Sequence, residues 1–224
     1  MPGTPCHITQ RGNNQQDVFF VDDDRRAYLE LLQKAAQQFG LAVHGYCLMT
    51  NHMHLVATPV REDSLAKAIG RTHLAYAQYV NRLHGRSGHL WQNRFDSCLL
   101  DKDHYSAALR YVERNPVRAR LVCLPWRYPW SSAAVHTGRA EPTRSLEAPQ
   151  WSREISPKEW EAELRGTDDE EMVRLLRIRT QTGRPLGSDR FMSKVEACLG
   201  RRVRPLLVGR QHGWRKVKTR RKGK

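Results

Sequence analysis

Residues 48–56 read Leu-Met-Thr-Asn-His-Met-His-Leu-Val, a strand-like apolar pattern interrupted by the polar turn Thr50-Asn51. Side chains alternate between the two faces of a strand, so His52 and His54 point to one face and Met53 to the other. Two imidazole groups on one face can share one divalent cation. An edge strand with two polar surface residues would show the same pattern, so the spacing alone leaves both interpretations open.

The sequence on both sides of this segment alternates between strand and helix patterns. Strands are predicted at residues 7–10, 42–49, 52–58 and 95–100. A first helix follows the carboxylates of residues 22–24 and ends at Gly40, and a second runs from about Asp63 to Gly85. Asp103 is the predicted cap of a third helix, which Pro116 terminates. The order β-α-β-β-α-β predicts an α+β, ferredoxin-like antiparallel sheet with helices on one face.

The third predicted helix carries a second group of polar residues. Tyr111 and Asn115 are four residues apart and therefore share one stripe of the helix. The apolar stripe runs instead through Tyr105, Leu109 and Val112, about 100° away around the helix axis. Tyr111 is thus not needed for the main apolar face and could meet a metal-bound phosphate. A tyrosine at the edge of the core remains the competing interpretation.

Charge and composition narrow the functional classes. The chain of 224 residues has a net charge of +15, and residues 201–224 contain 11 Lys and Arg and no acidic residue. Such a basic tail typically meets nucleic acid or an acidic surface, although a solvated end is also common. No apolar run reaches the length of a membrane span, and the five cysteines form no CxxC pair. We therefore expect a reduced, cytoplasmic protein associated with the nucleoid.

The composition also suggests a domain organisation. Residues 1–136 form the predicted main domain, and residues 137–167 are an acidic, proline-interrupted linker with a short helix. Residues 168–200 are predicted to form a small helical region, either a plain helical hairpin or a helix-turn-helix. The basic tail, residues 201–224, completes the chain.

Four motifs together carry a family resemblance. LMTNHMHLV, GHLWQNRFDSCLLDKDHY, RYVERNPVRARLV and YPWSS occur in this order over residues 2–135. They resemble the REP-associated tyrosine transposases, single-tyrosine members of the HUH (His-hydrophobic-His) nuclease superfamily related to insertion-sequence transposases. The resemblance implies His52 and His54 as the metal-binding pair, Asn115 as the third ligand and Tyr111 as the nucleophile. The chain departs from the family by beginning almost on the first strand, where many relatives have several more residues.

The activity implied by this resemblance is metal-dependent cleavage and joining of single-stranded DNA at palindromic repeat hairpins, through a covalent 5′-phosphotyrosine. Tyrosine is a weak nucleophile at neutral pH, so a cation must polarise the phosphate. Two histidines and an amide favour Mg²⁺ or Mn²⁺ over a structural zinc site. The alternatives are a rolling-circle or relaxase-type HUH nuclease and a domesticated, non-catalytic hairpin-binding protein. The oligomeric state is open between monomer and homodimer.

Basic and aromatic residues near these motifs are candidate DNA contacts. Cations can contact the DNA backbone, and aromatic rings can stack on bases. The predicted DNA-binding residues are Arg11, Arg94, Arg110, Arg114, Arg118, Arg120, Arg201, Arg202, Arg215, Lys216, Trp91 and Phe95. For the two aromatic residues, packing within the fold is the favoured interpretation.

The basic tail leads to a first prediction. Deleting residues 201–224 should weaken DNA binding without changing sequence preference, because interactions with the DNA backbone carry no sequence information. For single strands, a plot of log K against log salt should become shallower by roughly 0.7 for each phosphate that the tail neutralises in the intact protein. Filter binding or fluorescence anisotropy at several salt concentrations measures this slope. An unchanged slope would show that the tail does not touch DNA.

Overall fold

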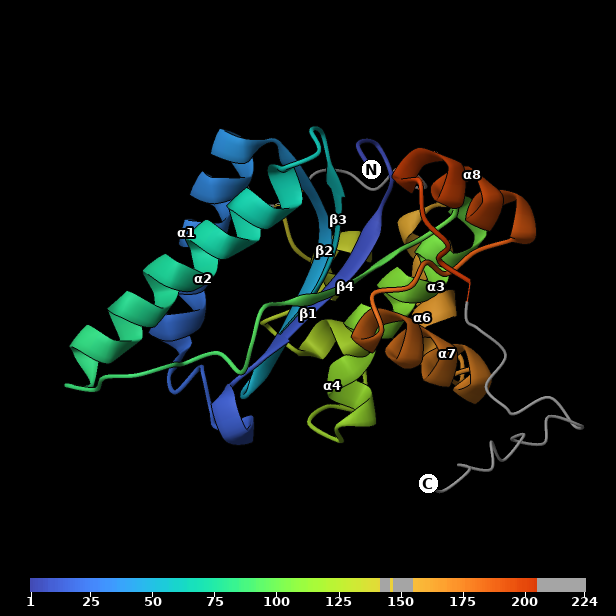
Figure 1. The fold of residues 1–224 in the computed structure, drawn as a ribbon. Coiled ribbons are helices and arrows are strands. Elements are labelled where there is room, and N and C mark those ends of the chain that lie inside the picture. Colours follow the sequence, from blue (N-terminus) through green and yellow to red (C-terminus); the bar gives the residue numbers. More distant parts are fainter. Residues whose placement is uncertain (142–145, 147–154, 205–224) are drawn as a thin grey trace, which may run out of the picture.

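The computed structural model describes residues 1–141, 146 and 155–204. Its centre is a four-stranded antiparallel sheet in the order β2-β3-β1-β4 (Figure 1). The strands are β1 (Cys6–Arg11), β2 (Leu41–Met49), β3 (His52–Pro59) and β4 (Asp96–Leu99). The predicted α+β architecture is therefore confirmed, with β3 and β1 as the two central strands.

Two crossover helices cover one face of this sheet. These are α1 (Asp22–Phe39) and α2 (Ser64–Leu83), which pack side by side (Figure 1). The Asp24 carboxylate accepts the backbone N–H groups of Phe20 and Val21, so the start of α1 is tied down. Gly40 ends α1 with a φ of 69°, a left-handed conformation that favours glycine. Both helices follow the predicted boundaries closely.

The other face of the sheet is covered as well. Helices α3 (Lys102–Glu113), α4 (Asn115–Arg118), α6 (Pro157–Arg165) and α7 (Glu170–Gln181) lie on this side (Figure 1). The prediction of helices on one face thus describes only α1 and α2. The physical reason is that the second face also carries apolar side chains, among them Cys47, Val56 and Cys98, which helices from the later part of the chain bury.

The remaining elements are short or peripheral. They are the 3₁₀ turns η1 (Asn13–Gln15) and η2 (Pro125–Arg127), and the helices α5 (Ala133–His136) and α8 (Asp189–Leu199). Helix α7 contacts β4 and β1, whereas α8 packs in a small apolar cluster with Met1 and Val203. No helix in the described ranges is long and apolar enough to cross a membrane.

The ends of α3 differ from those predicted. Its N-cap is Asp101 rather than Asp103, because Asp101 has an extended backbone and its Oδ1 accepts the N–H of His104 at 3.0 Å. Asp103 lies in the first turn. At the other end α3 stops at Glu113, and Pro116 opens the short helix α4 instead of ending the helical path.

Helix α3 packs the side chain of Leu109 against the backbone of β2 at Gly45. The β2–β3 pairing is irregular between Val43 and Gly45. A Cβ atom added at Gly45 would lie 2.2 Å from Cδ1 of Leu109, which is far inside van der Waals contact. The absence of a side chain at Gly45 is therefore what gives the Leu109 side chain of α3 its place against the strand.

A buried carboxylate holds three of the later segments together. Glu113 is fully buried, and its Oε1 lies 2.5 Å from both Ser132 Oγ and His136 Nδ1. Its Oε2 accepts the indole N–H of Trp160 at 2.8 Å. Trp160 belongs to α6, inside the predicted 137–167 linker, and is 1% exposed. This part of the linker is thus a packed helix joined to α3.

We predict that Glu113→Ala lowers the free energy of unfolding by about 3–5 kcal/mol, because the variant removes an acceptor shared by three buried donors. Urea denaturation followed by tryptophan fluorescence and circular dichroism measures the change. Glu30→Ala on the exposed face of α1 is the control and should stay within about 0.5 kcal/mol of wild type. Equal losses in the two variants would contradict a special role for Glu113.

Candidate active site

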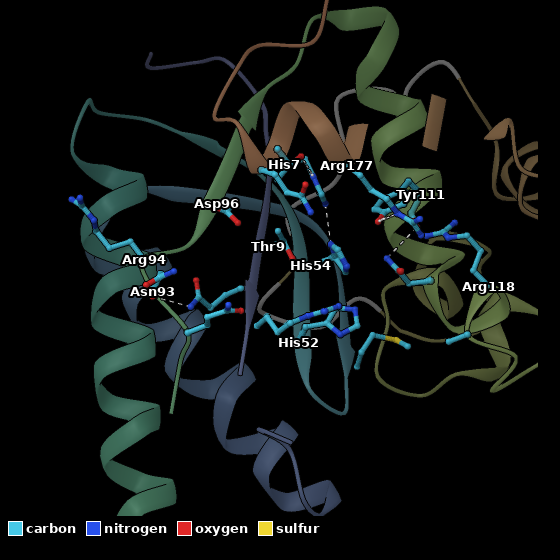
Figure 2. Close-up of a pocket in the computed structure, with 18 residues that line it drawn as sticks. His7, Thr9, His52, His54, Asn93, Arg94, Asp96, Tyr111, Arg118 and Arg177 are labelled. Carbon is cyan, nitrogen blue, oxygen red and sulfur yellow. Dashed lines mark hydrogen bonds between the residues drawn. The ribbon is translucent and has the colours of Figure 1, made fainter. Parts of the chain in front are cut away.

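A cavity of about 700 Å³ opens between the second face of the sheet, helices α3, α4 and α7, and the segment before β4. Its polar lining comes from elements far apart in the sequence (Figure 2). Seven residues predicted from sequence lie in its wall: Arg11, His52, His54, Arg94, Tyr111, Asn115 and Arg118. The fold therefore brings the two polar groups that the sequence suggested into one site.

The two histidines of β3 share a face, as the alternation predicted. In the register of β1 and β3, Arg11 lies opposite His52 and Thr9 lies opposite His54. The two imidazole rings are 5.0 Å apart between centroids and nearly perpendicular. Burial lowers the pKa of His52 to about 4, with a further contribution from the Arg11 charge. The ring is therefore neutral at pH 7, the form that binds metals.

The hydrogen bonding of His52 shows which of its nitrogens is available. Asn51 Nδ2 donates to the carbonyl oxygen of Gln15, so Asn51 Oδ1 is directed to His52 Nδ1, 2.6 Å away. An amide oxygen only accepts hydrogen bonds, so Nδ1 of His52 carries the proton. Nε2 then keeps the lone pair that a cation would use.

His54 lies beside a third histidine that sequence reasoning missed. His7 on β1 is 1% exposed, and its Nε2 lies 3.0 Å from His54 Nδ1. The two rings stack at 5.2 Å with an angle of 12° between their planes. Nδ1 of His7 lies 2.7 Å from the hydroxyl of Thr180 on α7. The alternation along β1 could have placed His7 on this face, but no local pattern indicated Thr180, 173 residues away.

The tyrosine hydroxyl is directed into the same cavity. Tyr111 is 6% exposed, and its ring meets those of His7 and His54 edge to face, each at 5.5 Å. The guanidinium of Arg118 lies 4.2 Å from the ring centroid and donates to the Tyr111 carbonyl. Nε of Arg177, on α7, donates to the hydroxyl oxygen at 3.3 Å. Arg177 was also missed, because only the packing of α7 places it here.

Tyr105, the other tyrosine of α3, has a different environment. It is buried in the apolar cluster beneath α3, and its ring meets that of His44 edge to face at 5.8 Å. It does not line the cavity described above.

Asn115 completes the possible ligand set. It is 7% exposed, and its Nδ2 donates to the Tyr111 carbonyl at 3.3 Å, which leaves its side-chain oxygen for other partners. Two neutral imidazoles and an amide oxygen suit a divalent cation that keeps open positions for oxygen ligands. In the described ranges, no group of three or more His, Cys, Asp and Glu could hold a metal ion. A closed zinc site of those residues is therefore not formed there.

Three of the predicted DNA-binding arginines, Arg110, Arg114 and Arg118, have internal partners. Asp168, between α6 and α7, lies 2.8 Å from Arg114 Nε and 3.3 Å from Arg110 Nη1. Arg110 also donates to the Glu163 and Thr167 carbonyls, and Arg114 donates to that of Leu164. Arg118 pairs with Asp168 at 3.4 Å while it also contacts Tyr111. These contacts fasten the connection between α6 and α7 to the helix that carries Tyr111.

The other candidate DNA contacts lie in different environments. Trp91 donates its indole N–H to the His73 carbonyl at 3.2 Å, and both Trp91 and Phe95 pack against the core under α1 and α2. These positions therefore fit the interpretation that both aromatic rings pack within the fold. The remaining cations are exposed: Arg11 and Arg94 at the cavity, Arg120 after α4, and Arg201 and Arg202 after α8. Arg215 and Lys216 lie outside the described residues.

An antiparallel sheet with a His-hydrophobic-His pair on a central strand, beside a helix that carries a tyrosine, has the architecture of transposases of the HUH nuclease class. The family model described as "Transposase IS200 like" matches residues 3–115, just over half of the chain. The chain belongs to this family of IS200-like transposases. Family membership implies a DNA-cleaving enzyme.

Solved structures add a comparison of folds. A REP-associated tyrosine transposase bound to a REP hairpin is similar at 16% identity with a TM-score of 0.54, covering 66% of this chain and 88% of that one. A provisionally named transposase from Deinococcus radiodurans R1 has 18% identity and a TM-score of 0.38, covering 49% of this chain and 88% of that one. No curated protein matches the chain. At this identity, the first likeness shows a shared fold.

The paired histidines lead to a prediction about metal binding. His52→Ala should weaken Mn²⁺ binding by roughly a hundredfold or more, because it removes one of few ligands. Titration calorimetry or the electron paramagnetic resonance of free Mn²⁺ measures the affinity. His89→Ala is a matched control, since His89 is exposed and outside the cavity lining. Unchanged Mn²⁺ affinity in His52→Ala would contradict the assignment of this site.

Proposed function

We propose that this chain is a metal-dependent endonuclease and strand transferase for single-stranded DNA, with Tyr111 as its nucleophile. The observation that carries the proposal is the cavity itself. The Tyr111 hydroxyl faces the same space as His52, His54 and the Asn115 amide. Arg177 contacts this hydroxyl, and Arg118 lies against the tyrosine ring. A phosphodiester in this space would meet a nucleophile, a metal-binding pair and positive charge together.

The residues of the cavity have separate roles in this proposal. His52, His54 and Asn115 would hold Mg²⁺ or Mn²⁺, which polarises the scissile phosphate when bound. Arg177 donates to the Tyr111 oxygen and would stabilise the negative charge that develops as the phenol loses its proton. Arg118, against the ring and the carbonyl of Tyr111, holds the side chain toward the histidines.

The proposed reaction exchanges one phosphoester for another. The Tyr111 oxygen attacks phosphorus, the bond to the 3′-oxygen breaks, and a 5′-phosphotyrosine forms. The proton lost by the phenol is balanced by the proton that the departing 3′-hydroxyl gains. Because the number of phosphoester bonds is unchanged, a second DNA 3′-hydroxyl can reverse the step and join strands without a nucleotide cofactor.

We propose palindromic repeat hairpins as the DNA partner. The exposed cations Arg11, Arg94 and Arg177 line the cavity and can contact a DNA backbone. The solved transposase with a similar fold is described as bound to a REP hairpin. Tyr111 and His54 of one chain already meet edge to face, which favours a monomer over exchange of tyrosine helices between two copies.

We predict that the wild-type protein, with Mn²⁺ and a single strand that carries the repeat hairpin, forms a protein–DNA adduct stable to denaturation. Tyr111→Phe should abolish the adduct, because it removes only the attacking oxygen. Tyr105→Phe is the matched control on the same helix and should still form it. Gel electrophoresis in denaturant followed by peptide mass spectrometry measures both outcomes.

Two results would change the assignment. An adduct that persists in Tyr111→Phe, or that maps to another residue, would show that Tyr111 is not the nucleophile. The absence of any adduct in the wild type, with hairpin binding intact, would favour the non-catalytic hairpin-binding protein.

A further inference from the structure

A chain of hydrogen bonds runs from the cavity to the C-terminal part of the fold. His54 Nδ1 lies 3.0 Å from His7 Nε2, and His7 Nδ1 lies 2.7 Å from Thr180 Oγ1. The Thr180 hydroxyl donates to the Leu176 carbonyl at 2.8 Å. His7, His54 and Thr180 are all at least nine-tenths buried, and they come from β1, β3 and α7. Figure 2 shows the bond between His7 and His54 across the two central strands.

The direction of these bonds follows from which atoms can donate. The Leu176 carbonyl only accepts, so the Thr180 hydroxyl uses its single proton there and accepts from His7 Nδ1. A neutral imidazole has a single N–H, and His7 places it on Nδ1. Its Nε2 therefore accepts, and the donor is Nδ1–H of His54.

We propose that His7 and Thr180 are positioning residues that hold His54 as the Nδ1-protonated tautomer, so that its Nε2 faces the cavity as a metal ligand. The proposal rests on the metal site proposed above. Asn51 imposes the same tautomer on His52 through a separate contact. Both rings would then offer the same nitrogen, and neither would need to exchange a proton before binding a cation.

In this proposal α7, through Thr180, helps to prepare a metal ligand of the site. Thr180 lies outside residues 3–115, the part that matches the family model. A merely structural role for the same bonds would be to fasten α7 to the sheet. The two roles differ in one observable, the position of the proton on His54, because fastening alone does not require a particular tautomer.

The test uses the full-length, metal-free protein with ¹⁵N-labelled histidine. Long-range proton–nitrogen NMR of the side chains reports which nitrogen of His54 carries the proton. We expect Nδ1–H in the wild type. We also expect a mixture of tautomers in Thr180→Val, which keeps the side-chain shape but removes the acceptor. Thr180→Ser, which restores a hydroxyl, should return the Nδ1–H form.

Mn²⁺ affinity is the second readout. Removing a hydrogen bond to a ligating histidine typically costs 10–100-fold in metal affinity, so we expect a decrease of about this size in Thr180→Val but not in Thr180→Ser. Thr182→Val is the matched control. Thr182 lies at the end of the same helix and its hydroxyl bonds the Ile178 carbonyl at 2.7 Å, yet its side chain is exposed.

Several outcomes would overturn the proposal. An Nε2–H tautomer of His54 in the wild type would contradict the proposal. This measurement needs no variant, so it remains decisive even if Thr180→Val fails to fold. Thr180→Val with an unchanged tautomer and unchanged Mn²⁺ affinity would do so as well. A wild type that binds no Mn²⁺ would remove the metal site on which the proposal rests. If the tautomer and Mn²⁺ results are as expected but DNA is not cleaved, only the proposed function fails.

Discussion

The antiparallel pairing of β1 with β3 is the constraint on which the site depends. It sets Thr9 opposite His54 and Arg11 opposite His52, and it brings His7 within hydrogen-bonding distance of His54. A slip of one residue would turn His52 and His54 toward α1 and α2 and replace them with Met53. Met53 and Ile8, both fully buried on the opposite face, oppose that slip because it would expose them. The apolar core thus determines the register of the polar site.

The two faces of the sheet are covered by helices from different parts of the chain. The face under α1 and α2 is covered by helices that the strand order requires, since each crosses between two strands. The other face is covered by α3 and by segments added later in the chain, α6 and α7. Glu113 and Asp168 join those later segments to α3 with buried or partly buried polar contacts. The cavity is the part of this second face that α3, α4 and α7 line but do not fill.

Much of the fold and of the candidate site could be predicted from the sequence, because the patterns that determine them are local. Alternation along the strand placed His52 and His54 on one face, and the 3.6-residue helical period separated Tyr111 from Tyr105. The glycine after α1 marked the end of that helix. Each of these signals acts over a few residues. Asp101 was missed as a cap because two nearby aspartates compete and only backbone geometry distinguishes them. Thr180 and Arg177 were inaccessible because their meeting with His7 and Tyr111 depends on how α7 packs against β1 and β4. The internal pairing of Arg110 and Arg114 with Asp168 is likewise a property of tertiary packing.

The close contact at Gly45 has a consequence for how the site tolerates change. Where two elements are separated by side chains, their spacing shifts with each substitution between them. Here Leu109 of α3 lies directly on the backbone of β2. The height of the helix above the sheet is therefore set at this point by one leucine side chain against bare backbone, two residues before Tyr111. A side chain added at Gly45, or a change of volume at Leu109, would alter this spacing and with it the separation between the tyrosine and the sheet.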